Sequence, residues 1–187
     1  MCGRFENNFS PYPIIEQLKF HFPEIDFELD EGQTGKINIA PTSKILTLTH
    51  TEQKYKITPM MWGIKFKEDS PLIFNSRIET IKEKKYWYNL FNKNRCLVPM
   101  TAFYEWKKEG VRKVPYRIFL PEEKLFFVPA LYLKKEEEFF ASLNMENSEA
   151  CPSATAATTR SSSFMTTVFA SGLPSDGTIF STVCLIT

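Results

Sequence analysis

Hydrophobic and polar residues recur with two different periods along this chain, and each period predicts a different kind of element. Apolar positions have helical spacing at residues 14–22, IIEQLKFHF, and Pro13 stands where a first helical turn tolerates proline. A second helical pattern covers residues 77–91, RIETIKEKKYWYNLF, with its lysines turned outward. The side chains that this second helix would bury are Ile78, Ile81, Tyr88 and Leu90. We therefore predict two helices.

Most of the remaining pattern is typical of β-strands, because it is rich in β-branched and aromatic residues with turn residues between the runs. The strands are predicted in residues 37–50, 54–66, 96–110, 111–120 and 124–135. The KKEG sequence that ends the third of these makes the third and fourth a hairpin. These elements predict an α+β fold, a single domain of residues 1–187 with a mainly antiparallel sheet and a few flanking helices.

Residues 136–178 differ from the rest of the chain. They run from an acidic cluster into the Ser/Thr/Ala-rich sequence CPSATAATTRSSS, and their periodicity is weak. We predict that they form a loop or a poorly ordered insertion, which is unusual inside a compact domain. A strand pattern returns only at residues 178–187, TIFSTVCLIT.

Composition limits the class of protein. A chain of 187 residues that is 43% hydrophobic can bury one sizeable core. Its net charge of +1 indicates no polyanion partner, so a nucleic-acid site would need a local basic patch, although a solvated face is the commoner explanation of such a run. The candidate patch is Lys82, Lys84, Lys85, Lys93 and Arg95.

The four cysteines show neither metal-ligand spacing nor a disulfide framework, and the N-terminal residues lack the apolar run of a signal peptide. We expect a cytoplasmic protein, with no metal, no cofactor and no membrane partner.

Cys2 is the first candidate for chemistry. Removal of Met1, which a small second residue permits, would leave Cys2 with a free α-amine beside its thiol. The two groups titrate at roughly pH 8 and 8.5, so neutral amine and thiolate coexist near neutrality. Such a 1,2-aminothiol condenses with an aldehyde to a thiazolidine, or its thiolate attacks a carbonyl with the amine as base. Cys2 alone does not distinguish these uses from an accident of the start site.

Two further stretches contribute polar groups that could serve a site. NSRIET, residues 75–80, places the amide of Asn75 and the guanidinium of Arg77 where a strand meets the predicted helix, and such groups can orient a phosphodiester. Glu105 lies in the apolar run FYEW and points either to solvent or into a partly buried pocket, where it could donate a proton. Trp62 and Phe66 could stack on bases, but aromatic residues at strand spacing more often belong to a core.

Seven motifs in order over residues 1–133 resemble the SOS-response-associated peptidase family, whose members are abasic-site processing proteins. The motifs are MCGRF, NIAP, WGI, NSRIET, RCLVPMTAFYEW, VPYRI and VPALYL. The resemblance implies an α+β fold around a twisted, barrel-like antiparallel sheet. It also implies covalent capture of ring-opened abasic sites in single-stranded DNA during the DNA damage response, by a monomer.

The resemblance further implies roles for individual residues. Cys2 would form the thiazolidine crosslink after Met1 removal, Asn75 would orient the substrate or the terminal amine, and Glu105 would protonate the sugar oxygen. Arg4 and Arg77 would hold flanking phosphates. Pro41 would line the DNA channel, and Phe66 would stand in for the family's wedge tryptophan. Self-removal of Met1 and abasic-site lyase activity are also implied.

The chain departs from the family pattern at its C-terminal end. Family members carry a His-x-Arg-x-Pro type stretch shortly after the segment that resembles TVCLIT, and this sequence stops at Thr187 before it. His21 and His50 match no family motif and receive no role. We therefore expect one abasic-site processing domain that is cut short at this end.

Two other classes of function stay open on the sequence. One is a terminal-cysteine amidohydrolase of the glutamine amidotransferase type, whose chains also begin Met-Cys-Gly. The other is a module that binds single-stranded DNA without a covalent bond.

Overall fold

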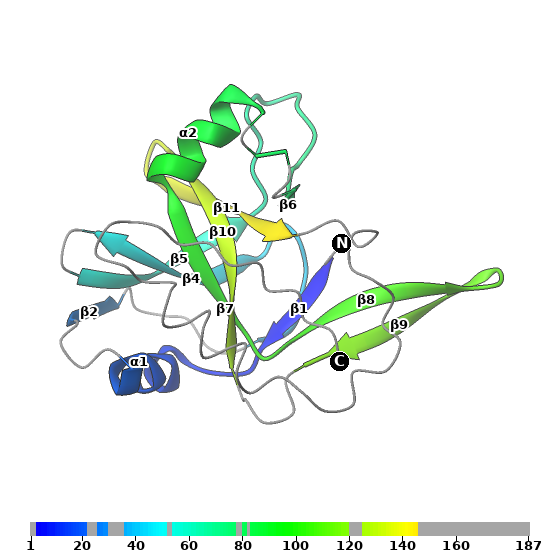
Figure 1. Cartoon of the computed structure of the whole chain (residues 1–187), viewed down its shortest axis with the longest axis horizontal. Helices are drawn as coiled ribbons and strands as arrows, with labels where there is room; N and C mark the ends of the chain where they lie inside the picture. Colours follow the sequence, from blue (N-terminus) through cyan, green and yellow to red (C-terminus); the bar gives the residue numbers. More distant parts are fainter. Residues whose placement is uncertain are drawn as a thin grey trace. The chain divides into compact units, whose positions relative to one another are not determined.

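The computed structural model describes residues 3–21, 26–29, 36–51, 54–77, 80–81, 83–119 and 125–145 (Figure 1). They belong to one compact unit that ends at Met145. Several sequence predictions lie outside the described residues: those on Cys2, Ile78, Lys82, residues 146–178 and the strand at 178–187. None of the described helices is long and apolar enough to cross a membrane.

Five strands form a closed ring of hydrogen-bonded neighbours: β4 (Lys44–Thr51), β5 (Lys54–Trp62), β7 (Arg95–Met100), β10 (Phe126–Lys135) and β11 (Glu138–Met145). Four of the contacts in the ring are antiparallel. The parallel pairing of β5 with β11, at Met61 with Phe140 and Trp62 with Ala141, closes it. This ring confirms the predicted α+β fold with a twisted, barrel-like sheet.

Two short strands extend the ring in parallel. β2 (Asp26–Leu29) pairs with β5, and β6 (Asn75–Arg77) pairs with β11. Among the described strands, β6 therefore lies at an edge and has one neighbour, β11, through the register Leu143 with Asn75 and Met145 with Arg77.

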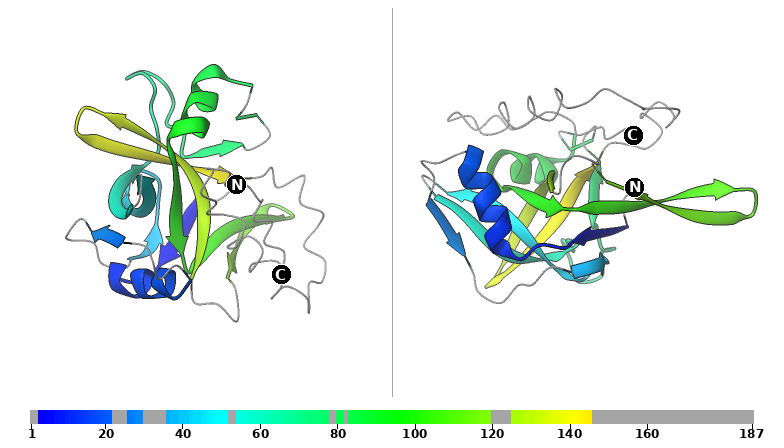
Figure 2. Two further views of the ribbon diagram at one scale, coloured as in Figure 1. Left: turned by 60° about the vertical axis from the view of Figure 1, so that its left-hand side comes forward. Right: turned by 90° about the horizontal axis from the view of Figure 1, so that it is seen from below.

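A second sheet contains four antiparallel strands in the order β3 (Lys36–Ile39), β1 (Arg4–Asn7), β8 (Ala102–Glu109) and β9 (Arg112–Ile118). The hairpin predicted from KKEG is confirmed as β8 and β9, with Gly110 in the left-handed region at φ +60°. Figures 1 and 2 show that the distal half of this hairpin extends beyond the other strands of the unit.

Trp62 joins the two sheets. Its side chain is completely buried, and its ring lies 5.0 Å from the ring of Phe5 on β1 and 5.9 Å from the ring of Phe74, both in edge-to-face arrangements. Its indole nitrogen donates a hydrogen bond to the carbonyl of Phe74 at 2.9 Å. A buried tryptophan thus fixes β1 against the segment that leads into β6.

The two predicted helices exist, but their boundaries differ from the sequence expectation. α1 spans Pro11–His21, so it begins three residues before the predicted start and buries Ile14 while Phe20 is exposed. α2 spans only Lys85–Lys93.

The prediction for residues 77–91 is wrong in its first part because Arg77 belongs to β6, whose backbone pairs with β11. α2 buries Trp87, Leu90 and Phe91, which have the i, i+3, i+4 spacing of one helix face. Ile81 and Leu90 are buried as predicted, but Tyr88 is exposed.

The loop predicted from residue 136 onward is wrong for residues 138–145. Residues 138–145 form β11, which pairs along β10 from Lys135 with Glu138 to Ala130 with Leu143. The acidic cluster that suggested a loop is the tight turn itself, and Glu136 adopts a positive φ of 51° there. The run predicted as one strand at 96–110 is also divided, because Thr101 separates β7 in the barrel from β8 in the second sheet.

Candidate functional site

The start of β1 lies at the centre of the candidate site. Arg4 pairs with Tyr104 of β8, so Glu105 is the next β8 residue beyond the first residue of β1. On the other side Phe5 pairs with Ile39 of β3, so Pro41 follows where β3 runs past the start of β1. The antiparallel register therefore gathers three sequence-predicted residues, Arg4, Pro41 and Glu105, at one end of the sheet.

The Pro41 turn is held against Trp62. The backbone N–H of Thr42 donates to the carbonyl of Trp62 at 2.8 Å, and the N–H of Trp62 donates to the carbonyl of Ser43 at 2.9 Å. Thr42 has a positive φ of 72°, which allows the tight turn that Ser43 closes by donating to Ala40. The NIAP motif is thus fixed to the tryptophan of the WGI motif.

Side chains project from both faces of the second sheet. Residues paired across antiparallel strands share a face, and successive residues alternate. Arg4, Glu6 and Tyr104 lie on one face, called the Glu6 face below. Phe5, Phe103 and Glu105 lie on the other, called the Phe103 face.

Arg4 and Glu105 consequently project to opposite sides of the sheet. Arg4 donates from Nη1 to Oδ1 of Asn38 at 2.9 Å, which holds its guanidinium beside the end of β3. Glu105 is half-buried and shares its face with Phe5, the residue that contacts Trp62. A proton donor here would serve the side of the sheet that faces the barrel.

β6 supplies the other two predicted polar residues. Asn75 and Arg77 lie on the same face of this strand, and the Asn75 amide oxygen is buried whereas Arg77 is exposed. The carbonyl of Phe74, just before Asn75, accepts hydrogen bonds from both the Trp62 indole and the N–H of Leu143. Because Trp62 also contacts Phe5, Asn75 is linked to the start of β1 through a single buried side chain. Figures 1 and 2 show the end of β11, beside β6, close to the start of β1.

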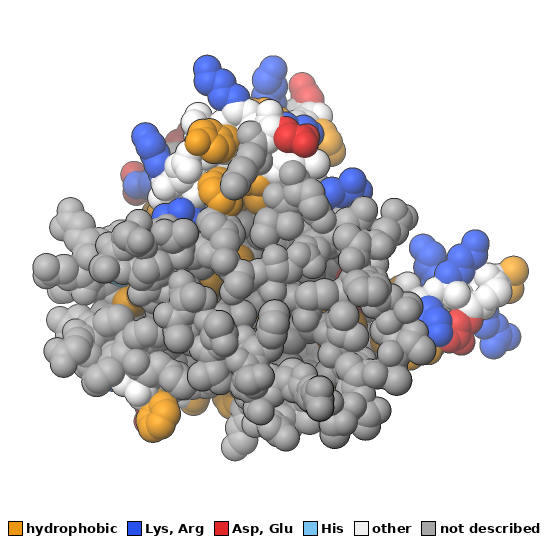
Figure 3. Space-filling model, viewed as in Figure 1, with side chains coloured by type: hydrophobic (Ala, Val, Ile, Leu, Met, Phe, Trp, Pro, Cys, Tyr) orange, Lys and Arg blue, Asp and Glu red, His pale blue; other side chains and the backbone are white. Residues whose placement is uncertain are grey.

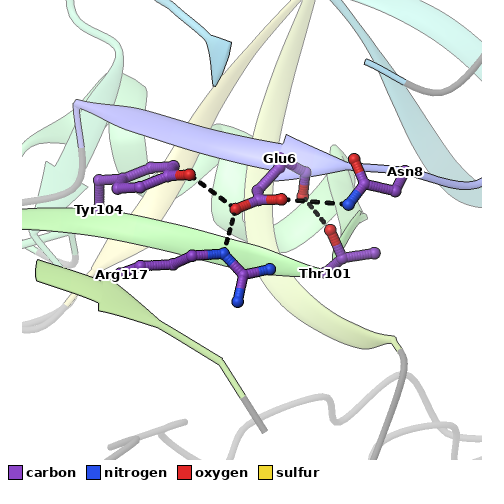
Figure 4. Close-up of polar contacts among 5 residues, drawn as sticks. All are labelled: Glu6, Asn8, Thr101, Tyr104 and Arg117. Atoms are coloured by element: carbon purple, nitrogen blue, oxygen red, sulfur yellow. Dashed lines mark hydrogen bonds and ion pairs between the residues drawn. The ribbon is translucent and has the colours of Figure 1, made fainter. Parts of the chain in front are cut away.

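Glu6 anchors β1 through a buried carboxylate (Figure 4). It is 4% exposed and accepts hydrogen bonds from the Arg117 guanidinium, from the Tyr104 hydroxyl at 2.8 Å and from the Asn8 amide at 3.1 Å. Its backbone carbonyl accepts from both the N–H and the hydroxyl of Thr101, at 2.8 and 3.1 Å. One residue of β1 is therefore bonded to β8, to β9 and to the junction between the two sheets.

The network changes the acidity of its members. The hydrogen bond from Arg117, opposed by burial and assisted by Tyr104 and Asn8, lowers the pKa of Glu6. The same carboxylate raises the pKa of the Arg117 guanidinium and of the Tyr104 hydroxyl by accepting their hydrogen bonds. Glu6 is thus a buried charge with its partners in place, which is the condition under which burial of a carboxylate is tolerated.

The sequence analysis did not identify Glu6, Tyr104 and Arg117 as a group. Glu6 directly follows MCGRF, and Arg117 lies in VPYRI, but the residues are 98 and 111 positions away from their partner. The available signal was an acidic residue next to Phe5 at the end of the MCGRF motif, together with Tyr104 and Arg117 on strands that the sequence pattern predicts to pair.

Phe66 does not join the other predicted residues in the contacts that define the site. Its ring lies 4.3 Å from that of Tyr86 and 5.1 Å from that of Trp87, and it packs on the apolar cluster beneath α2. Of the predicted basic patch, Lys85 and Lys93 on α2 and Lys84 just before it are exposed, whereas Arg95 begins β7 and is half-buried. Figure 3 shows Lys and Arg side chains over α2 and over the hairpin.

Cys96 is the one cysteine within the described ranges, and it is buried on β7. Burial raises the pKa of its thiol well above the ordinary range, so it cannot supply a thiolate near neutral pH. The same part of the chain contains no group of three or more His, Cys, Asp or Glu that could hold a metal ion. What the described site offers is two arginines, an amide and a carboxyl around one strand terminus.

A profile of the SOS response associated peptidase (SRAP) family matches residues 1–170. The chain belongs to this family. Among its relatives, the abasic site processing protein YoqW of Bacillus subtilis is 34% identical over 142 residues, which cover 72% of this chain and 61% of YoqW. YedK of Escherichia coli is 29% identical over 70% of this chain and 59% of its own length. HMCES of Xenopus tropicalis is 35% identical over 70% of this chain and 46% of its own length.

The solved structures similar to this SRAP chain support the fold. A phage-related protein of Bordetella bronchiseptica superimposes with a TM-score of 0.63 at 22% identity, over 85% of this chain and 75% of that one. A protein of Bacteroides thetaiotaomicron superimposes with a TM-score of 0.57 at 22% identity, over 80% and 71%. The SRAP chain spans about three fifths of the length of its bacterial relatives YoqW and YedK.

Proposed function

We propose that this SRAP chain processes abasic sites in DNA and captures them covalently through Cys2. The observation that carries the proposal is the geometry around the start of β1, because Cys2 precedes it by two residues and consecutive Cα atoms are about 3.8 Å apart. Cys2 is therefore joined by a short tether to a strand whose position Glu6, Trp62 and the Pro41 turn fix. Names given to the relatives YoqW, YedK and HMCES support the same class of substrate.

The proposed chemistry uses the free amine and the thiol of Cys2 in turn. After loss of Met1, the amine adds to the C1 aldehyde of the ring-opened deoxyribose, and the resulting carbinolamine loses water to give an imine. The thiolate then adds to the imine carbon, and the nitrogen takes up a proton, which closes a thiazolidine. One C–N bond and one C–S bond form for each water released, so no oxidant or reductant is needed.

The surrounding residues have complementary roles in this proposal. Glu105 delivers a proton to the sugar oxygen, which is the group that must leave as water. Asn75 orients the amine or the sugar. Arg4 and Arg77 bind the phosphates on either side of the lesion, as expected for cations that approach a DNA backbone.

Pro41 lines the path of the strand beside Arg4, and Phe66 contributes a ring farther along, near α2. The chain acts as a monomer in the cytoplasm on single-stranded DNA, where an extruded sugar costs no base pairing.

Intact mass spectrometry under denaturing conditions tests the proposal. The protein is incubated with a single-stranded oligonucleotide that contains one abasic site, beside an undamaged oligonucleotide. We expect a one-to-one adduct with the damaged strand only, with the mass of the two components less one water, at residue 2 after loss of Met1. The same spectra reveal self-removal of Met1 and strand cleavage by β-elimination.

Two variants separate the roles. Cys2→Ser should give no persistent adduct, because the oxygen ring that replaces the thiazolidine hydrolyses readily. Glu105→Gln should slow capture by about 10²-fold or more without weakening DNA binding. Glu109→Gln, on the same strand and the same face, is the matched control and should leave the rate unchanged. Equal rates in Glu105→Gln and Glu109→Gln would remove the proton-donor role.

The alternatives make different predictions in the same assay. A terminal-cysteine amidohydrolase would show no adduct but would hydrolyse glutamine in a reaction blocked by Cys2→Ala. A module that only binds single-stranded DNA would retain its affinity in Cys2→Ala and would never survive denaturation as an adduct.

A further inference from the structure

The distal half of the β8–β9 hairpin has two faces that differ in charge. On the Phe103 face, Glu109 lies opposite Arg112, and Lys107 lies 3.8 Å from the Glu109 carboxylate and over the ring of Tyr116. The Tyr116 hydroxyl donates to the same carboxylate at 2.9 Å. The basic residues of this face are therefore accompanied by an acidic one.

On the Glu6 face of the same half, the described residues provide no acidic partner. Lys108 lies directly opposite Lys113, and both are exposed. Residues directly opposite in an antiparallel pair have Cβ atoms about 4.5–5.5 Å apart, and like charges in this arrangement repel. Neither lysine makes an ion pair or hydrogen bond within the part of the chain that the structure describes. The next pair toward the site is Trp106 with Pro115, and Trp106 is 43% exposed.

This face is continuous with the candidate site. Arg4, Tyr104, Trp106 and Lys108 follow one another along the Glu6 face, from the start of β1 to the distal part of the hairpin. At about 3.3 Å per strand residue, the lysine pair lies roughly 13 Å beyond Tyr104. Figure 3 shows that Lys and Arg side chains are prominent on the visible side of the hairpin.

We propose that Lys108 and Lys113 form a phosphate clamp that binds the DNA strand beyond the lesion, with Trp106 as a stacking surface between the clamp and the site. The proposal rests on the proposed function for the identity of the polyanion. A phosphate placed between the lysines relieves their mutual repulsion and gains two ionic hydrogen bonds. A planar ring with an exposed face accepts a base without regard to sequence. The hairpin then serves as an arm that extends the bound length of DNA.

Binding of undamaged single-stranded oligo(dT) by the Cys2→Ala protein tests the clamp apart from the crosslinking chemistry. Fluorescence anisotropy is measured as the salt concentration is raised, for this Cys2→Ala parent and for three double variants made in it. Lys108→Gln/Lys113→Gln removes the clamp, and Lys107→Gln/Arg112→Gln removes the same charge from the opposite face of the same hairpin. Lys108→Arg/Lys113→Arg, which keeps both charges, should retain the parent's affinity.

We expect the clamp variant to bind on the order of tenfold more weakly at low salt and to lose about 1.4 from the salt slope, the value for two phosphate contacts of a single strand. The opposite-face variant should change the slope by less than half as much. Equal losses of affinity and salt slope in the clamp variant and the opposite-face variant would show a general charge effect and overturn the clamp. Failure of the Cys2→Ala parent to bind oligo(dT) would overturn it too. The abasic-site adduct is measured separately. Cys2→Ala should lose the adduct and still show the difference in DNA binding between the clamp variant and the opposite-face variant. The two results therefore distinguish failure of the clamp from failure of the proposed chemistry.

Discussion

The two halves of strand β8 lie in different environments. The first half, from Ala102 to Glu105, is buried or half-buried and pairs with β1 as well as β9. The second half, from Trp106 to Glu109, is exposed, and among the described strands it pairs with β9 alone. The strand is continuous, so the difference arises from what covers it and not from its own backbone.

One hairpin can therefore fix the position of β1 through its covered half and extend away from the other strands through its exposed half. Beside the covered half, on β1, the Glu6 carboxylate accepts hydrogen bonds from three donors, and it is the only buried carboxylate among the residues that the structure describes. In the exposed half, two lysines face each other without an acidic partner among the described residues. Uncompensated charge is tolerated where water can solvate it and is costly where it cannot.

Truncation of an aromatic side chain in each half should give the largest contrast. Phe103→Ala removes a side chain that is 8% exposed and packs edge-to-face on Phe126 at 6.3 Å, so we expect a loss of about 3–5 kcal/mol in the free energy of unfolding. Trp106→Ala, in the exposed half, should cost less than about 1 kcal/mol. Urea unfolding of both variants measures this contrast. Similar losses would mean that Trp106 is covered in the folded chain.

The arginines of β9 provide a second contrast. Arg117→Gln leaves the Glu6 carboxylate with only Tyr104 and Asn8 as donors, and we expect a loss of about 2 kcal/mol because a buried acceptor loses its charged partner. Arg112→Gln lies on the exposed half and should stay within about 0.5 kcal/mol of the parent. Urea unfolding compares the two variants. An Arg117→Gln protein as stable as the Arg112→Gln protein would contradict the role of Arg117 as an anchor of Glu6.

Lowering the pH should destabilise the protein through Glu6, the residue of β1 that lies beside the covered half of β8. The folded-state pKa of Glu6 lies below its unfolded value of about 4.3, so its stabilising contribution is complete above that value and is lost as the pH falls through the folded pKa. Glu6→Gln lacks this titration. We expect it to be less stable than the parent at pH 6 and to approach the parent as the pH falls from about 4.5 toward 3. Two parallel curves of unfolding free energy against pH would contradict the assignment.

The smallest effect concerns the exposed half and has the opposite sign. Lys113→Glu converts the like-charge pair with Lys108 into an opposite-charge pair, so it should stabilise the free protein by about 0.2–1 kcal/mol. The same change should weaken binding of single-stranded DNA. Thermal unfolding at low salt measures the gain, and its disappearance at high salt provides the control. A loss of stability would show that the two lysines do not repel each other.

The sequence predicted those features that depend on neighbours within a few residues. The β8–β9 hairpin follows from Gly110 and its flanking strand patterns. Of the buried face of α2, the helical spacing predicted Leu90 but not Trp87 or Phe91. The family motifs add more, because they single out Arg4, Pro41 and Glu105 without showing that register brings them together.

Features that depend on distant pairing were missed or misplaced. Nothing local distinguishes Arg77 as a strand residue until β11 supplies the hydrogen bonds of β6, so the sequence pattern predicts a helix from residue 77 onward. The acidic cluster and the weak periodicity that follows it predict a loop where β11 lies. The Glu6 network needed strand parity across about a hundred residues, which a single sequence does not contain.

The order of synthesis gives the β1–β8 pairing a consequence in time. The hydrogen bond from Tyr104 to Glu6 joins residues 98 positions apart, so the first strand to leave the ribosome lacks its β8 neighbour until residue 104 has been added. At about 5–20 residues per second, this interval lasts roughly 5–20 s. During that time β1 is not yet held by its final neighbours, so the proposed removal of Met1 can take place before the anchor of Glu6, Tyr104 and Arg117 assembles.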